Sequence, residues 1–144
     1  MQLKKPAAGD IWHALSVQRI EWSTANIDNI KIETSLDSGR TWTVLLSSYP
    51  ASATYYEWTV PEKTSDSCYI RISDVLDPST SSSNYKNNPF KIPAPSISID
   101  PLPNAVFAGT VLPISWVSSG IRKLNIYVSF DNKATYTKIA DTIP

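Results

Sequence analysis

Apolar and polar side chains alternate along much of this chain, most clearly over residues 28–34, 54–60 and 68–73. Alternate side chains of an extended strand point to opposite faces, so each segment predicts an antiparallel strand with one apolar and one wet face. On the first strand Ile32 would face a core, and Glu33 would face solvent. Turns are predicted in the intervening stretches rich in Pro, Ser and Asp, which are residues 48–53, 61–67 and 77–83.

The chain also contains an internal repeat. Shifted by 94 residues, residues 20–50 match residues 114–144 without a gap, and nine of the 31 positions are identical. In the first copy these are Ile20, Trp22, Ile27, Ile32, Ser35, Asp37, Thr41, Thr43 and Pro50. A repeat of this length is too long for a solenoid unit and indicates a tandem domain.

The second copy is incomplete in this sequence. Residues 100–144 correspond to residues 6–50, and nothing corresponds to the segment from Tyr55 to Ile92. Strands are expected near residues 105–108, 110–116, 122–130 and 134–140. The inner side chains expected to lie open to water include Leu124, Ile126, Val128 and Phe130. Because open sheet edges and exposed apolar faces are unfavourable, we expect that the natural chain continues past Pro144 or that another chain completes this half.

These correspondences predict three parts and an all-β fold. Residues 6–92 would form a complete β-sandwich of about seven strands. Residues 93–99 would form a Pro-rich, semi-rigid linker and the first strand of the next unit. Residues 100–144 would form the first half of a second sandwich. Strands and turns at this spacing, with 11 Pro in the chain, favour a sandwich or barrel.

Six runs of residues carry a resemblance to a known family. They are Gly9 to Trp12, Ile20 to Trp22, Ile30 to Trp42, Tyr56 to Pro61, Cys68 to Asp74 and Asn88 to Ile92. Together they resemble a bacterial tandem immunoglobulin-like surface repeat. Such repeats are similar to the immunoglobulin-like domain of fungal cell-wall glucan-assembly proteins and, more loosely, to fibronectin type III modules. The resemblance implies an immunoglobulin-like antiparallel sandwich in a secreted or cell-surface protein, and it brings no catalytic residue. The chain departs from the pattern at Leu15, opposite Gly109, and at Lys133, opposite Gly39.

One segment fits the Asp-box pattern Ser-x-Asp-x-Gly-x-Thr-Trp, a β-hairpin turn known from sialidase-like propellers and from unrelated β folds. Its residues are Ser35, Asp37, Gly39, Thr41 and Trp42. Asp37 would accept hydrogen bonds from turn amides, Gly39 would permit a positive φ, and Trp42 would fold back as an apolar plug. A propeller blade has about 40 residues and this repeat has 94, so the box predicts a structural hairpin and no sialidase.

The aromatic residues raise the question of sugar binding. Four tryptophans are predicted in the core: Trp22 and Trp116 because they recur at equivalent positions of the repeat, Trp58 because it shares a face with Tyr56 and Val60, and Trp12 because its counterpart is Val106. Three tyrosines fall on faces opposite their core neighbours and are candidates for an exposed aromatic patch, namely Tyr55, Tyr69 and Tyr127. Flat aromatic faces stack on sugar rings, which leaves open a carbohydrate-binding module of a secreted hydrolase as a second hypothesis.

Composition removes several other classes of function. The 13 basic and 13 acidic side chains cancel, so we expect no nucleic-acid partner, and no apolar run is long enough for membrane insertion. The one Cys, Cys68, alternates inward with isoleucines and is expected to be buried. The one His, His13, stands opposite Phe107 of the second copy, which suggests a packing position. We therefore expect no metal site, no cofactor and no enzymatic activity.

The leading expectation is a non-enzymatic structural or adhesion-type module of an extracellular or cell-surface protein. Its partners would be the rest of its own longer chain or neighbouring copies, with cell-wall or extracellular polysaccharide as a further possibility under the carbohydrate-binding hypothesis. A third hypothesis is a subunit of an extracellular fibre, in which a neighbouring chain completes the half-domain.

Overall fold

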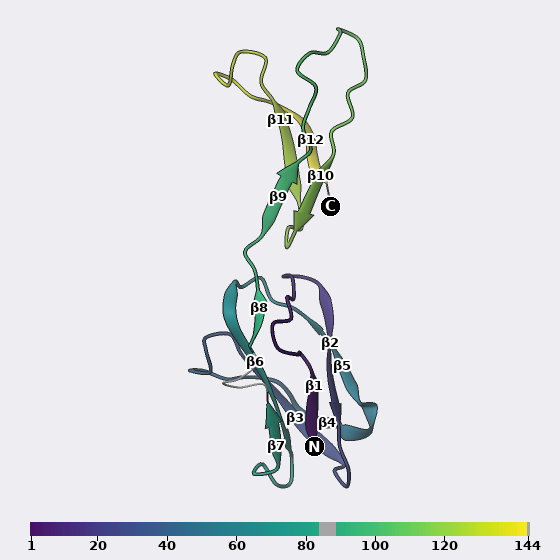
Figure 1. Ribbon diagram of the computed structural model, residues 1–144, viewed down its shortest axis with the longest axis vertical. Coiled ribbons are helices and arrows are strands. Elements are labelled where there is room, and N and C mark those ends of the chain that lie inside the picture. Colours follow the sequence, from purple (N-terminus) through teal and green to yellow (C-terminus); the bar gives the residue numbers. More distant parts are fainter. Residues whose placement is uncertain (84–88, 144) are drawn as a thin grey trace. The chain divides into compact units, whose positions relative to one another are not determined.

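The computed structural model describes residues 1–83 and 89–143 and has an all-β fold (Figure 1). These residues form twelve strands and one short 3₁₀ helix, η1 (Ala51–Ala53), and every pairing between the strands is antiparallel. The chain divides into two compact units, Met1–Ala94 and Pro95–Pro144. The all-β, antiparallel fold expected from the alternation is therefore confirmed.

The first unit contains two sheets. One has the strand order β1-β2-β5. Its strands are β1 (Gln2–Lys5), β2 (Val17–Ser23) and β5 (Tyr55–Thr59). The other has the order β4-β3-β6-β7, and β8 pairs with β6 beside this path. Its strands are β3 (Asn29–Ser35), β4 (Thr43–Pro50), β6 (Ser65–Asp74), β7 (Ser81–Ser83) and β8 (Phe90–Ile92). The three segments with the clearest alternation form β3, β5 and β6.

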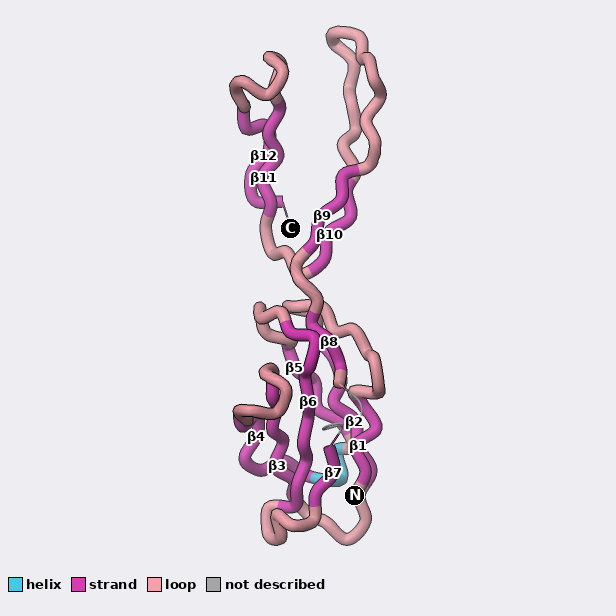
Figure 2. The backbone as a smooth tube through the Cα atoms, turned by 60° about the vertical axis from the view of Figure 1, so that its left-hand side comes forward, coloured by secondary structure: helices cyan, strands magenta, loops and turns pink. Residues whose placement is uncertain are grey.

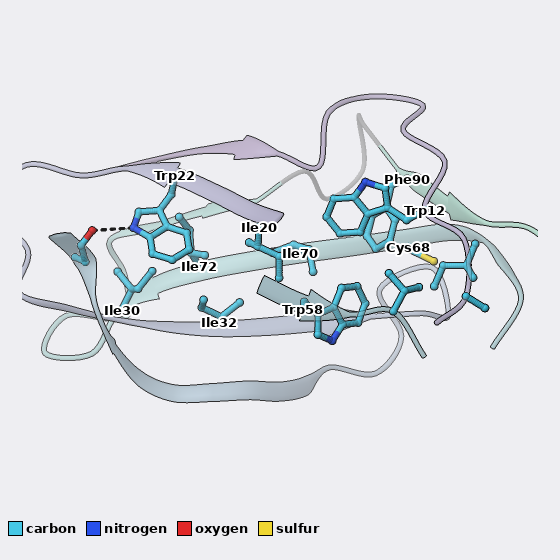
Figure 3. Packing of buried hydrophobic residues seen from close by; sticks show 14 residues of the cluster. Trp12, Ile20, Trp22, Ile30, Ile32, Trp58, Cys68, Ile70, Ile72 and Phe90 are labelled. Carbon is cyan, nitrogen blue, oxygen red and sulfur yellow. Dashed lines mark hydrogen bonds between the residues drawn. The ribbon is translucent and has the colours of Figure 1, made fainter. Parts of the chain in front are cut away.

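Side chains from both sheets form one core (Figure 3). Ile20 and Trp22 of β2 pack in it with isoleucines of β3 and β6. These are Ile30, Ile32, Ile70 and Ile72, all without solvent exposure. The Trp22 Nε1–H donates to the Ala51 carbonyl over 2.9 Å, so the polar atom of this side chain is satisfied inside the core. Two antiparallel sheets around one core make the unit β-sandwich-like.

Three aromatic rings form another part of this core. Trp12 lies outside the longer strands, yet its ring centre is 4.7 Å from that of Phe90 and 6.0 Å from that of Trp58. Its backbone N–H donates to the Lys91 carbonyl over 2.9 Å, which holds the segment beside β8. The expected burial of Trp12, Trp22 and Trp58 is confirmed.

The second unit contains two separate two-stranded sheets, β9–β10 and β11–β12 (Figure 2). The strands are β9 (Ser96–Ile99), β10 (Trp116–Ser119), β11 (Leu124–Val128) and β12 (Thr137–Ile143). None of the side chains described from residue 93 to residue 141 is fully buried. The unit therefore has strands but no closed core within the described residues.

The predictions of two strands in the second unit are wrong. Residues 105–108 form no strand, and of residues 110–116 only Trp116 belongs to one. Residues 111–117 correspond to β2 of the first unit. There β2 pairs with β5, and a strand needs such a partner for its backbone hydrogen bonds. The described residues after 94 contain no counterpart of β5, and Pro113 removes one backbone donor from this stretch.

A constant displacement of 94 residues relates the pairing of β3 with β4 to the pairing of β11 with β12. The equivalent pairs are Ile30–Tyr49 and Leu124–Ile143, Ile32–Leu46 and Ile126–Ala140, Glu33–Val44 and Tyr127–Lys138, and Thr34–Thr43 and Val128–Thr137. Both ladders also shift register at equivalent places, before and after Ile32 in one and before and after Ile126 in the other. The correspondence therefore extends from side-chain identity to backbone pairing.

Left-handed backbone conformations recur at the same displacement. The equivalent positive-φ positions are Leu15 and Gly109, Asn26 and Gly120, Ser38 and Asn132, and Gly39 and Lys133. This conformation favours glycine because a Cβ crowds the backbone there. Leu15 and Lys133, the two departures from the sequence pattern, thus keep the conformation of the glycines that stand opposite them.

Candidate functional site

The loop between β3 and β4 is closed by the Asp37 carboxylate. The Ser35 hydroxyl donates to Asp37 Oδ1 over 2.8 Å, and the Thr41 N–H donates to the same oxygen over 2.9 Å. The Thr41 hydroxyl donates to Oδ2, and the Gly39 N–H donates to Ser35 Oγ over 2.9 Å. These bonds, that of the Thr41 hydroxyl above all, lower the pKa of Asp37 to about 2. The carboxylate is therefore committed to the turn.

The loop between β11 and β12 has the same bonds. Ser129 Oγ donates to Asp131 Oδ1 over 2.8 Å, and the Thr135 N–H donates to that oxygen over 2.8 Å. The Thr135 hydroxyl donates to Oδ2 and is the largest cause of the lowered pKa of Asp131, about 2. The Lys133 N–H takes the place of the glycine amide and donates to Ser129 Oγ over 2.9 Å. Both loops therefore act as structural turns.

Trp42 does not serve as a purely apolar plug. It is half-buried, and the guanidinium carbon of Arg71 lies 4.3 Å from its ring centre, a cation–π distance. The same guanidinium holds Glu33, with Arg71 Nη2 2.8 Å and Nε 2.9 Å from Glu33 Oε2. The ring, the guanidinium and the carboxylate therefore form one cluster on the face of β3 and β6 that points away from the core.

Glu33 lies at the centre of this cluster, and its expected exposure to solvent is wrong. Glu33 is only 6 % exposed, and Lys31 Nζ lies 2.7 Å from Glu33 Oε1. Burial raises the pKa of Glu33, but hydrogen bonds from Lys31 and Arg71 outweigh it and leave the pKa lowered. A buried carboxylate is tolerated here because two cations pair with it.

A polar hollow of about 390 Å³ lies beside the cluster. Lys31, Glu33 and Arg71 line it together with Ser73 and Ser81. Both of these cations are already paired with the Glu33 carboxylate, so they do not present unpaired charge to a ligand. The hollow offers hydroxyls and paired charges, a weak recognition surface.

The structure separates the tyrosine candidates. Tyr55 is 40 % exposed on β5, with the Arg19 guanidinium carbon 4.4 Å from its ring centre. Tyr69 is only 7 % exposed, which corrects its expected exposure: it lies on β6, a strand flanked by β3 on one side and by β7 and β8 on the other. Tyr127 is exposed in the second unit. Tyr55 and Tyr69 lie on different sheets and form no common surface.

The open inner face of the second unit is the most unusual surface of the chain. Ile97 and Ile99 of β9 are 50 % and 60 % exposed, and Leu124 and Ile126 of β11 are half-buried. These four residues, with Ile114 and Trp116, line a cavity of about 110 Å³ between the two sheets. Apolar side chains therefore remain partly accessible to solvent between the two sheets of this unit.

Trp116 belongs to this face, and its expected burial in a core is wrong. It is only half-buried, whereas its counterpart Trp22 is 1 % exposed. Trp22 packs in a core to which β5, β6 and β8 contribute, and the described residues of the second unit contain no counterparts of these strands. The expected exposure of Leu124, Ile126 and Val128 holds only in part, because all three are half-buried, while Phe130 is 90 % exposed.

Each sheet of the second unit has only two strands among the described residues. In the first unit β3 pairs with β4 on one side and β6 on the other. Its counterpart β11 pairs with β12 alone within residues 95–143. One edge of β11 therefore presents backbone N–H and C=O groups to which the described chain adds no strand.

No family model, curated protein or solved structure matches this chain. The functional interpretation therefore rests on the geometry.

The other side chains that could bind a metal or react, including Cys68 and His13, form no catalytic or metal-binding arrangement among the described residues. Across residues 1–83 and 89–143, no three His, Cys, Asp or Glu side chains converge as a metal site would require. Nor does any helix in these residues have the length and apolarity to cross a membrane. Cys68 is buried as expected, and burial raises the pKa of its thiol. His13, expected at a packing position, is exposed in a turn where its carbonyl accepts the Ser16 hydroxyl over 2.6 Å.

The Glu33 cluster was missed from the sequence alone. Its signal was present, because Glu33 and Arg71 both fall on the polar face of a predicted strand. Only the pairing of β3 with β6 reveals that the two residues stand directly opposite each other.

Proposed function

We propose that this chain is a non-enzymatic structural module of an extracellular or cell-surface protein, built from immunoglobulin-like units repeated in tandem at an interval of 94 residues. The observation that carries the proposal is the pairing of β11 with β12, which repeats the register of β3 with β4 together with both of its irregularities. Irregular register is a specific feature of a fold, and two unrelated hairpins have no reason to share it.

The use of the acidic side chains supports a structural role. Asp37 and Asp131 close the two loops, and Glu33 binds two cations beneath a tryptophan. Each carboxylate accepts bonds that lower its pKa, so it stays ionised and engaged in the fold. In a catalytic acid or base the pKa is instead shifted toward the pH at which the enzyme works.

The carbohydrate-binding alternative has less support. It would need aromatic faces gathered on one surface, whereas Tyr69 is buried and Tyr55 already contacts Arg19. A binding assay on insoluble polysaccharides separates the two hypotheses. The structural module predicts no saturable binding. Binding that is lost in Tyr55→Ala or Tyr127→Ala would favour the carbohydrate-binding module instead.

The repeat itself is tested by completing the second unit. Residues 51–92 are appended after Pro144, so that they stand to β12 as they stand to β4 in the first unit. We expect the extended protein to bury Trp116 and to protect the amides of β11 from hydrogen exchange. A control protein carries Asp at the appended counterparts of Ile70 and Ile72 and should gain no protection. If the unmodified segment also gives none, the two units are not equivalent and the proposal fails.

A further inference from the structure

One pair of neighbouring segments in the described part of the first unit runs parallel. Residues 9–12 lie beside β8, with Ile11 opposite Lys91. Three backbone hydrogen bonds join the two segments: from the Gly9 N–H to the Pro89 carbonyl over 3.1 Å, from the Lys91 N–H to the Asp10 carbonyl over 2.9 Å, and from the Trp12 N–H to the Lys91 carbonyl over 2.9 Å. We call residues 9–12 and 89–91 the terminal patch, because they lie toward the two ends of this unit.

Aromatic packing reinforces the terminal patch. The Trp12 side chain is part of the core, with its residue only 5 % exposed, and its ring centre lies 4.7 Å from that of the fully buried Phe90. An aromatic pair at this distance stabilises a fold beyond the area that it buries. The two segments therefore cannot separate without removing Trp12 from the core.

The chain enters and leaves the first unit at opposite ends of it. Both views of the backbone place the N-terminus at one end of this unit and β8 at the other (Figures 1 and 2). Because residues 9–12 and β8 run in the same direction, tension between Met1 and Ala94 pulls them past each other along their length. The three hydrogen bonds run between the segments, across the direction of pull, so they are strained together and not one after another.

The strand β1 lies on the same path, but it protects less of the core. Its pairs with β2 are pulled along their length in the same way. Release of β1 removes the half-buried Leu3 from the interior, whereas release of the terminal patch removes Trp12. The terminal patch is therefore the barrier that keeps the core closed once β1 is pulled away.

We propose that the terminal patch carries tension through the first unit and makes the unit resistant to being pulled apart at its ends. This adds a mechanical activity to the structural role, and it rests on the proposed function, because only in a tandem array does tension enter each unit before its first strand and leave after its last. Resistance of this kind depends on the direction of pull and not on stability alone.

The test compares two directions of pull on the full chain in optical tweezers. In one version Met1→Cys and Ala94→Cys attach the handles, and Cys68→Val removes the other thiol. In the second version Asp28→Cys and Ser52→Cys attach them at the open end of the β3–β4 pair, both at exposed positions. The first version should withstand forces at which the second unfolds, because the β3–β4 pair opens one bond at a time. Unfolding at the same force in both versions would overturn the proposal.

Two tryptophan substitutions locate the resistance within the unit. Trp12→Leu should speed unfolding under constant end-to-end tension about fivefold, the size of one lost aromatic contact. Trp22→Leu changes an equally buried ring away from the terminal patch. It should alter this rate by less than about twofold, because contacts that are still formed at the transition state do not affect the unfolding rate. Urea unfolding should show that both variants lose stability. Equal acceleration by the two substitutions would overturn the proposal.

The result can be separated from that for the proposed function. If the protein extended by residues 51–92 closes its second core while the two directions of pull give the same unfolding force, the mechanical inference is wrong and the proposed function stands. If the extended protein fails to close its second core, the proposed function fails, and the role of the terminal patch in a tandem array fails with it.

Discussion

Gly39 and Lys133 have the same left-handed backbone in equivalent loops, with φ of 79° and 71°. Each amide donates over 2.9 Å to the hydroxyl of a serine four residues earlier, Ser35 or Ser129. The hydrogen bonds of the loop therefore hold the conformation even where the residue disfavours it. Glycine lowers the cost of this turn, and the aspartate network defines its shape.

Substitution of Gly39 measures the free-energy cost of a left-handed backbone at a residue other than glycine. Gly39→Lys should keep the loop and destabilise the first unit by about 1 to 2 kcal/mol, the penalty of a left-handed non-glycine residue. Urea unfolding followed by tryptophan fluorescence gives the value. Arg40→Lys, one residue on, should change the free energy of unfolding by less than about 0.5 kcal/mol. A collapse of the fold in Gly39→Lys would show that the hydrogen bonds alone do not define the loop.

Acid should weaken the first unit through Asp37. Its pKa in the folded protein, about 2, lies below the ordinary value of 3.8, so the ionised carboxylate contributes stability that is complete above the ordinary pKa. That contribution is lost as the pH falls through about 2. Asp37→Asn should flatten the fall in unfolding free energy below pH 4. Thr41→Val removes the main donor and raises the folded pKa of Asp37 toward 3.8, so the fall should become smaller and end at a higher pH. An unchanged acid profile in both variants would contradict the assignment.

The Glu33 cluster should be worth more than an exposed ion pair. Glu33→Gln removes the charge that Lys31 and Arg71 share and should cost about 2 kcal/mol of unfolding free energy, as for a hydrogen bond to a charged group. The matched control is Glu57→Gln, which breaks the exposed pair with Arg19 at 3.0 Å and should cost less than about 1 kcal/mol. Equal costs would show that burial adds nothing to the Glu33 interactions.

The equivalent tryptophans should respond differently to truncation. Trp22→Ala opens a closed core and should cost about 3 to 5 kcal/mol in the first unit. Trp116→Ala removes a half-buried ring and should leave the unfolding of the first unit unchanged. In the protein extended by residues 51–92, Trp116→Ala should become costly in the second unit. Hydrogen exchange resolved by segment measures both, and a small effect of Trp22→Ala would contradict the core described here.

Cys68 reports on opening of the first unit. Its side chain has no solvent exposure, and burial raises the pKa of the thiol, so little reactive thiolate is available at pH 7. Modification by a disulfide reagent should be slower than in denaturant by on the order of 10³-fold, for a stability of about 5 kcal/mol. Core variants such as Trp22→Ala should speed it. Complete labelling of the native protein within minutes would mean that the unit opens freely.

The alternation predicted the strands that carry the core, because period two is strong where one face is buried. Thus β3, β5 and β6 lie where their isoleucines and tryptophan indicated. By contrast, β7 lies in a run of serines predicted as a turn. Its place depends on backbone bonds to β6, and the Ser82 hydroxyl accepts the Leu3 N–H over 2.9 Å. No side-chain pattern encodes such a strand.

The candidate sites were harder to predict because they depend on pairing between distant residues. Alternation places Glu33 and Arg71 on outward faces, but the pairing that buries Glu33 joins residues 38 positions apart. Tyr69 was predicted as exposed because alternation places it on the face opposite Cys68 and Ile70, yet it is only 7 % exposed, so alternation alone did not predict its burial. Trp116 was assigned to a core because it matches Trp22 in the repeat, but the described residues of the second unit contain no counterparts of β5, β6 and β8, which contribute to the core around Trp22.

The two ladders of the second unit indicate an order of folding events. The β11–β12 pair keeps the register of its counterpart without a third strand, so this register is encoded within the hairpin and its aspartate loop. The β9–β10 pair does not keep the register of its counterpart, β1–β2. Trp22 of β2 pairs with Leu3, whereas the equivalent Trp116 of β10 pairs with Ile99, the counterpart of Lys5. Hairpins form in about 1 to 10 μs. During synthesis, we therefore expect β3 and β4 to reach their final pairing before β6 exists, whereas the pairing of β1 with β2 is not defined by these two strands alone.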